Sequence, residues 1–348
     1  MPVMTVTGKV DASDLGITAP HEHIFIDMEV FFSPPAEIGA KNIAYGPVTI
    51  EKLGILKRNP FAVLDNVKMM DEETQLSELN YFKAAGGRTV VDASTVGLGR
   101  DPELLAMVAA KSGLNIIAGA GFYVDGAQTD EIRALTIEDM ENQIVQEIEH
   151  GIGHTRIRAG IIGEIGISHV MYPFEKKSLI AACRAQIRTG APLMIHINPW
   201  STQGLEAMKI VDEYNVPHEK VVICHSDVEN REDYIFKLLD MGVYIEFDNF
   251  GKEMFTDRWD VKPGSGRFVT DWERVLLVKK IVDRGYAKQL LLSTDICLKS
   301  LLHAYGGWGY DHILTHIVPM LDEVGVSSAD LEQILVKNPA CWLDYDVR

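Results

Sequence analysis

Short apolar runs alternate with longer segments of helical periodicity along the whole chain. Eight of these runs have the length of buried strands, and they lie at about 15–22, 88–93, 115–121, 159–164, 192–197, 220–225, 243–248 and 289–294. Helical patterns separate the runs, as is typical of repeated βα units and a parallel sheet. We therefore predict a (β/α)8 TIM barrel.

Three of the intervening helices have recognisable ends. Thr136 with Asp139 forms a capping-box pattern at the start of an apolar stripe that stops at Gly151. A second helix is predicted to begin near Phe174, after Pro173, and to stop at Gly190. A last helix, which begins at 327 or 328, is expected to end before Pro339.

Two long connections interrupt this alternation. Residues 24–70 follow the first strand and residues 249–270 follow the seventh. Loops at the carboxyl ends of barrel strands carry active sites, so we expect the loops after strands 1, 7 and 8 to form the substrate pocket. Because no linker-like or low-complexity tract divides the chain, residues 1–348 are predicted to form a single barrel domain.

Composition excludes several classes of partner. The chain has 348 residues, 47% of them hydrophobic, and 33 basic against 50 acidic residues give a net charge of −17. Nucleic acid and anionic membranes need clustered basic residues, so we expect a small-molecule substrate and neither of those partners. Without a leader pattern or a spanning apolar run, the protein is expected to be cytoplasmic, and self-association into a homo-oligomer is left open.

Cysteine usage is sparse. The four cysteines are widely spaced and form no CxxC motif, so they indicate buried thiols rather than a disulfide scaffold. Side chains alternate along a strand, so Cys224 is expected to face the helices if its neighbour His225 faces the barrel interior.

Six ionisable residues stand at or just after the carboxyl ends of predicted strands: His21, His23, Glu164, His196, His225 and Asp295. The first two are separated by one residue, so on a strand both imidazoles point the same way. Imidazole and carboxylate ligands suit zinc and similar divalent ions. Strand ends converge on one face of a barrel, and unrelated core histidines have no reason to share that position. We therefore predict a metal site.

With these residues the chain resembles the phosphotriesterase family of the amidohydrolase superfamily, above all its phosphotriesterase-related branch. The resemblance covers nearly the whole chain and rests on segments 21–23, 119–125, 159–166, 224–227, 293–295, 305–313 and 338–339. It implies a binuclear centre with two divalent ions, zinc first among them. His21, His23 and Asp295 would bind the more buried ion, and His196 and His225 the more exposed one.

The resemblance also implies that an acid from the fourth strand bridges the two ions. In better-known members a carboxylated lysine does so, whereas here Gly163 stands at that position and Glu164 follows it. A one-residue offset turns a side chain to the opposite face of a regular strand. Glu164 can therefore bridge only if the strand is irregular, which Gly160 and Gly163 would permit.

The activity that this centre implies is hydrolysis. A hydroxide held between the two ions would be the nucleophile, and Asp295 would take its proton and deliver it to the leaving group. The expected substrate is a small carboxylic ester, lactone or N-acyl amide, with anionic compounds among the candidates. A phosphotriester hydrolase is the alternative, and a barrel that binds a ligand or metal without turnover is the alternative from another class.

Candidate substrate contacts lie just beyond the strand ends. Four are aromatic, namely Tyr123, Trp200, Trp308 and Tyr310. The seventh loop is basic within an acidic chain, and its cations form either a solvated surface or a clamp for an anionic substrate: Lys252, Arg258, Lys262 and Arg267. His312 and His316 have helical spacing and are interpreted as structural, because the six-ligand set is complete without them.

Overall fold

The computed structural model describes residues 2–33, 41–254 and 266–347. Within them, eight parallel strands follow one another around the sheet in the order β12-β11-β10-β9-β8-β7-β6-β3. Their bounds are β3 (Thr18–Glu22), β6 (Thr89–Asp92), β7 (Asn115–Ala120), β8 (Ile161–Ile167), β9 (Leu193–Ile197), β10 (Val221–Ile223), β11 (Tyr244–Phe247) and β12 (Leu290–Leu292). Every strand overlaps its predicted range, so the predicted barrel is confirmed.

The two ends of the sheet meet through hydrogen bonds. The backbone N–H of Asp295, after β12, donates to the His21 carbonyl in β3 at 3.1 Å. The Glu22 carboxylate accepts from the Thr294 and Ile296 N–H groups at 2.9 and 2.8 Å and from the Ser293 hydroxyl at 2.8 Å. These bonds close the barrel and bring the first and last strands together at the predicted metal site.

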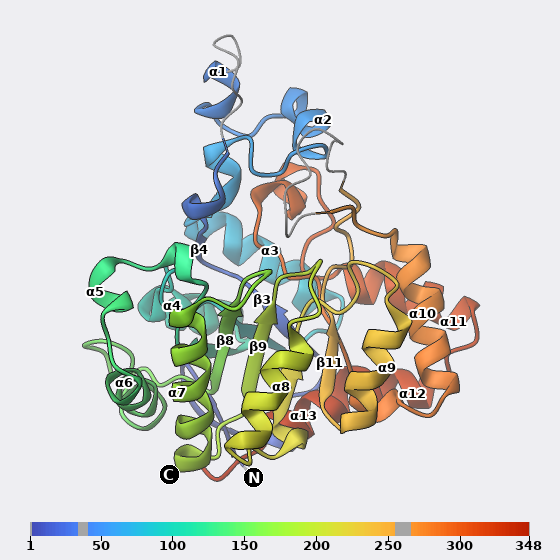
Figure 1. The fold of residues 1–348 in the computed structure, drawn as a ribbon. Helices are drawn as coiled ribbons and strands as arrows, with labels where there is room; N and C mark the ends of the chain where they lie inside the picture. The colour runs from blue at the N-terminus through green and yellow to red at the C-terminus, as the bar shows by residue number, and fades with distance from the viewer. Residues whose placement is uncertain (1, 34–40, 255–265, 348) are drawn as a thin grey trace.

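Helices surround the sheet, and Figure 1 shows α7, α8 and α9 against its outer face. The longer helices are α3 (Glu72–Ala84), α4 (Pro102–Ser112), α6 (Ile137–Glu149), α7 (Pro173–Thr189), α8 (Gly204–Glu213), α9 (Glu232–Met241) and α10 (Asp271–Asp283). The shorter ones are α1 (Lys41–Ala44), α2 (Leu53–Leu56), α5 (Asp130–Arg133), α11 (Val318–Glu323), α12 (Ser328–Glu332) and α13 (Asn338–Leu343). Short paired strands complete the fold, namely β1 (Pro2–Thr5) with β2 (Gly8–Asp11) and β4 (Ile26–Asp27) with β5 (Lys68–Met69).

The predicted helix ends are confirmed with one exception. Thr136 and Asp139 cap α6 reciprocally, and α7 runs from Pro173 to the left-handed Gly190. The expected stop before Pro339 is wrong, because helical turns continue from α12 through 333–337 into α13. Pro339 is the second residue of α13 and directly follows the wider π-helical turn over 333–337.

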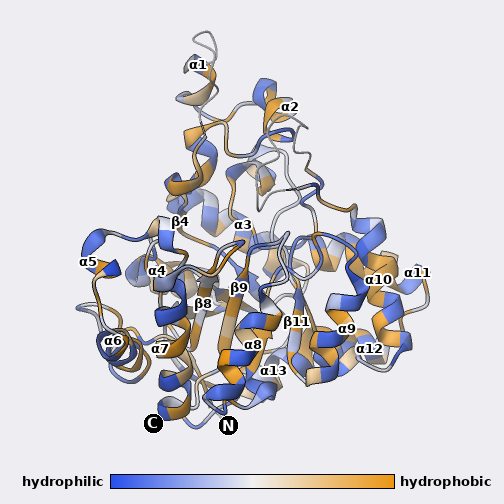
Figure 2. Cartoon of the chain, in the orientation of Figure 1, coloured by the Kyte–Doolittle hydropathy of each residue, from blue (hydrophilic) through white to orange (hydrophobic). Residues whose placement is uncertain are grey.

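Strand side chains divide into an outer and an inner apolar layer. The outer layer packs against the helices, and Figure 2 shows β8 and β9 as mainly hydrophobic. The inner layer fills the lower barrel, and one cluster includes Val91, Ile117, Ile161, Met194, Val222, Cys224 and Leu291. This apolar cluster excludes water from the barrel interior below the strand ends, so the ionisable groups lie above the cluster.

Cys224 is therefore inside the barrel, and the expectation that it faces the helices is wrong. β10 ends at Ile223, and His225 has a left-handed backbone with φ of 55°. The alternation of a regular strand does not extend to residues 224 and 225, so both side chains can lie on the inner side.

The predicted active-site loops extend from the carboxyl ends of the strands. In Figure 1 the segment after β3, with α1 and α2, stands above the barrel. The loop after β11 is described to residue 254 and again from residue 266. No helix in the described part of the chain is long and apolar enough to cross a membrane.

Candidate metal centre

The structure brings all six candidate ligands together, and all six are buried. On one side, His23 Nε2 lies 3.2 Å from Asp295 Oδ1 and 3.4 Å from Glu164 Oε1. His21 Nε2 lies 3.6 Å from Glu164 Oε2 and 3.7 Å from Asp295 Oδ1. Two imidazoles and two carboxylates thus face a common point at the end of β3.

On the other side, Glu164 contacts a second pair of histidines. Its Oε2 lies 2.9 Å from His196 Nδ1 and 3.7 Å from His225 Nε2. These two rings approach each other, with His225 Nε2 2.8 Å from His196 Nδ1. The Glu164 carboxylate therefore stands between the two pairs of histidines.

An irregularity in β8 accompanies the inward position of Glu164. The pairing of β8 with β9 shifts register between Ile162 and Ile165. Gly163 has a φ of 136°, and a Cβ there would collide with the carbonyl oxygen of Met194. Only glycine adopts this backbone readily, so a side chain at position 163 would strain the strand, and Glu164 is the residue of this turn that reaches the site.

The donor atoms fit a divalent cation. His21 Nδ1 lies 3.0 Å from the Glu246 carboxylate, which fixes that nitrogen as the N–H donor. In the neutral ring, His21 Nε2 carries the lone pair, and this buried nitrogen has no hydrogen-bond partner among the described residues. It faces the carboxylates of Glu164 and Asp295 at 3.6 and 3.7 Å, so acceptors converge where a cation would satisfy all of them.

The electrostatics of the centre also favour positive charge. Burial lowers the pKa of His225, but Asp248 and Glu164 outweigh it and raise that pKa to about 10. Burial likewise opposes the ionised form of Glu164, yet His196 and the neighbouring histidines hold its pKa well below the usual range. Ionised carboxylates in a buried site need cationic partners, whether imidazolium or metal.

Two acids behind the ligands were not predicted. Glu246 in β11 holds His21, and Asp248 after β11 holds His225, with its Oδ1 2.9 Å from His225 Nδ1. Such carboxylates fix the tautomer and orientation of a metal-binding histidine. A sequence signal existed, because the two acids are separated by one residue at the end of the seventh apolar run, as His21 and His23 are in the first.

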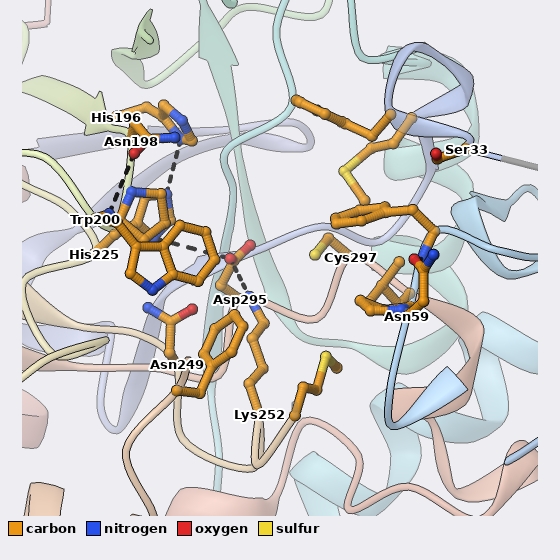
Figure 3. Close-up of a pocket in the computed structure, with 18 of the residues that line it drawn as sticks. Ser33, Asn59, His196, Asn198, Trp200, His225, Asn249, Lys252, Asp295 and Cys297 are labelled. Carbon is orange, nitrogen blue, oxygen red and sulfur yellow. Dashed lines mark hydrogen bonds and ion pairs between the residues drawn. The ribbon is translucent and has the colours of Figure 1, made fainter. Parts of the chain in front are cut away.

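A cavity of about 390 Å³ opens above the centre, with His196, His225 and Asp295 in its wall. Its outer wall is largely apolar and comes from the loops after β3 and β11, including Met28, Phe31, Phe61, Met254 and Phe268. Three predicted substrate contacts line it: Tyr123, Trp200 and Lys252. Figure 3 shows Lys252 and Asp295 pointing toward each other across the pocket floor.

Trp308 and Tyr310 lie away from this cavity. Tyr310 is 1% exposed, and its hydroxyl lies 2.9 Å from the His23 carbonyl, so it supports β3 from behind. Trp308 is 50% exposed and stacks on His312. Neither ring forms part of the cavity wall, so the expectation that both contact the substrate in this pocket is wrong.

Lys252 is the buried cation of the pocket. It is 4% exposed and forms an ion pair with Asp295. Burial lowers its pKa, but the Asp295 carboxylate outweighs burial and holds the pKa above its ordinary value, so the ammonium is charged. Of the other predicted clamp residues, Arg267 is exposed, and Arg258 and Lys262 lie outside the described residues.

His312 and His316 do not join the metal centre. His312 Nε2 lies 2.7 Å from the Asp271 carboxylate at the start of α10. His316 packs against Trp308 and His312. Both histidines therefore have structural contacts.

An eight-stranded barrel with buried histidines and carboxylates at its strand ends is an architecture shared by metal-dependent TIM-barrel hydrolases. The chain belongs to the phosphotriesterase family, whose sequence model matches residues 1–343. It is 35% identical over 349 residues to N-acetyltaurine hydrolase of Mus musculus, covering 99% of this chain and 98% of that protein. The predictions of family and of a hydrolase are confirmed.

Two solved structures are similar along nearly their whole length. A resiniferatoxin-binding protein from Rhodobacter sphaeroides has a TM-score of 0.95 and 34% identity, with 100% of this chain and 96% of that chain covered. The phosphotriesterase homology protein from Escherichia coli has a TM-score of 0.78 and 28% identity, with 95% and 99% covered.

Proposed function

We propose that the protein is a metal-dependent hydrolase of small anionic N-acyl amides, with the whole chain acting as one domain. The observation that carries this proposal is the buried Lys252 ammonium beside Asp295 at the floor of the pocket. An anionic substrate with its scissile bond at the centre would meet this cation. The relative named N-acetyltaurine hydrolase supports the same class, because N-acetyltaurine is an acetamide whose amine half carries a sulfonate.

We further propose two divalent ions, with zinc as the first candidate. His21, His23 and Asp295 would hold one ion, His196 and His225 the other, and Glu164 would join them. The position of Glu164 between the two pairs of histidines supports this assignment. Such ions lower the pKa of water and polarise a carbonyl group when they are bound.

Asp295 is positioned to move the proton. Burial opposes its ionised form, but Lys252 and the neighbouring histidines hold its pKa below the ordinary range, so it is an acceptor at neutral pH. Water supplies a hydroxyl group to the acyl carbon and a proton to the nitrogen as the C–N bond breaks. Asp295 would carry that proton from water to the leaving amine and emerge unchanged.

The pocket residues would orient the substrate. Burial raises the pKa of Tyr123 well above its usual value, so its hydroxyl is a neutral donor near His196 for a substrate oxygen. Lys252 would bind the anionic end. Trp200 packs on Phe268 and would form an apolar wall.

A substrate panel tests the proposal. The purified, zinc-loaded protein is assayed with N-acetyltaurine, a neutral N-acetyl amide, a lactone, a carboxylic ester and a phosphotriester. We expect N-acetyltaurine to have the highest kcat/KM. Preference for the phosphotriester would favour the alternative activity, and ligand binding without turnover of any compound would contradict a hydrolase.

A further inference from the structure

The side-chain amide of Asn249 has one defined orientation. Asn249 follows β11, is 2% exposed and lines the pocket. Its Nδ2 donates to Asp227 Oδ1 at 2.8 Å and to Asp248 Oδ1 at 2.6 Å. Ionised carboxylates only accept hydrogen bonds, so a flipped amide would place its oxygen against two acceptors. The neighbours therefore determine which end of the amide is the nitrogen.

Both carboxylates are themselves held in place. Asp227 Oδ2 accepts from the Asn249 backbone N–H at 3.0 Å and lies 3.0 Å from Arg274 Nε. Arg274 is fully buried and also binds Asp271 at 2.8 Å. Asp248 accepts from the His225 backbone N–H at 2.9 Å. A buried, charged network thus fixes the two acceptors that orient Asn249.

The amide oxygen of Asn249 remains as an acceptor on the pocket side. Among residues 2–33, 41–254 and 266–347, none donates a hydrogen bond to Asn249 Oδ1. In Figure 3 this oxygen lies on the side of Asp295, whereas the nitrogen points away from it. Lys252 and Tyr123 offer donors to the same pocket, so the pocket presents both kinds of hydrogen-bonding group to a substrate.

We propose that Asn249 is a specificity-determining residue that accepts a hydrogen bond from the N–H of the scissile amide. An ester carries an oxygen at that position, which has no hydrogen to donate and would face the Asn249 oxygen with its lone pairs. As the C–N bond breaks, the leaving amine keeps that hydrogen, so the contact persists through cleavage. The inference rests on the proposed amide hydrolysis and adds the group that selects amides over esters.

The test compares two substrates that differ only in this atom. N-acetyltaurine and its ester isostere, 2-acetoxyethanesulfonate, share the acyl group, the chain length and the sulfonate. We expect Asn249→Ala to lower the amide-to-ester ratio of kcat/KM about tenfold, which is the usual effect of one lost hydrogen bond. Asp227→Asn, which leaves Asn249 in place but removes one of its acceptors, should lower the ratio in the same direction.

Asn198→Ala is the matched control. Asn198 also lines the pocket, but its Oδ1 accepts from the Trp200 backbone N–H at 3.2 Å. Its replacement should leave the ratio at the wild-type value.

The outcomes separate this inference from the proposed function. One outcome is that the wild-type protein hydrolyses N-acetyltaurine while Asn249→Ala lowers kcat/KM for the amide and the ester equally. In that case Asn249 does not accept a hydrogen bond from the substrate N–H, so the inference is overturned while the proposed function stands. An equal loss of kcat/KM for both substrates together with a fall in zinc content would assign Asn249 to the metal centre. That result would also overturn the inference. A wild-type protein that hydrolyses neither substrate would refute both.

Discussion

Replacing Lys252 by methionine tests the proposed recognition of an anionic substrate. Methionine keeps most of the length and apolar surface of the side chain and removes only the ammonium. Two opposite charges about 4 Å apart attract by about 4 kcal/mol at an effective dielectric constant of about 20. Asp295 already neutralises part of this charge, so a net value of about 1.5–3 kcal/mol is more appropriate for a charged hydrogen bond. That energy corresponds to about 10- to 100-fold in kcat/KM.

The assay compares N-acetyltaurine with 2-acetamidoethanol, a neutral amide of similar length. Loss of the ammonium also changes the surroundings of Asp295, and this effect is common to both substrates. We therefore expect the kcat/KM ratio of the anionic to the neutral amide to fall by about 10- to 100-fold, mainly through KM.

A control variant keeps this result specific. Lys299→Met removes a cation that pairs with Asp65 at 2.5 Å and does not line the pocket, so the ratio should not change. If Lys252→Met lowers kcat/KM for the anionic and the neutral amide equally, Lys252 acts only through Asp295. That result would refute the anion-binding role.

Other expected outcomes concern the centre and the stability of the fold. Glu164→Ala should lose bound zinc, measured by elemental analysis, because a carboxylate between two cations is removed; full retention of zinc would contradict its bridging role. Asp295→Asn, compared at equal zinc content, should lower kcat by at least about a hundredfold, and near-normal turnover would remove Asp295 from proton transfer. Burial lowers the pKa of His218, but the Met241 carbonyl and Asp212 raise it above the ordinary value. The resulting stability is present below about pH 6.5 and is lost as pH rises through the raised pKa. His218→Ala should therefore lower the urea midpoint more at pH 6 than at pH 9, and an equal loss at both would argue against this linkage.

The barrel could be predicted from the sequence because its strands are buried on both faces. Such strands are nearly continuous apolar runs, as at 192–197 and 220–225, and need no long-range information to be found. The candidate ligands were found for a related reason. A parallel barrel places the carboxyl ends of its strands on one face, so position along the run predicts position in space.

Other features of the site could not be fully predicted from the sequence, because they depend on the backbone geometry at strand ends and on contacts between distant segments. The inward position of Glu164 accompanies the backbone irregularity at Gly163, and the position of Cys224 follows from the early end of β10. The orientation of Asn249 depends on Asp227, which is in turn held by Arg274 from α10. Gly160 and Gly163 indicate the first of these features in the sequence, whereas local patterns do not reveal the contacts of Asn249, because those contacts join residues from separate βα units.

The most direct test of the proposed metal centre is a crystal structure of the zinc-loaded protein with anomalous scattering recorded at the zinc absorption edge. We expect two strong peaks, one among His21, His23 and Asp295 and one beside His196 and His225, with Glu164 touching both, as in the proposed centre. A single fully occupied peak with His196 and His225 unliganded, or Glu164 turned into the helix layer, would contradict it.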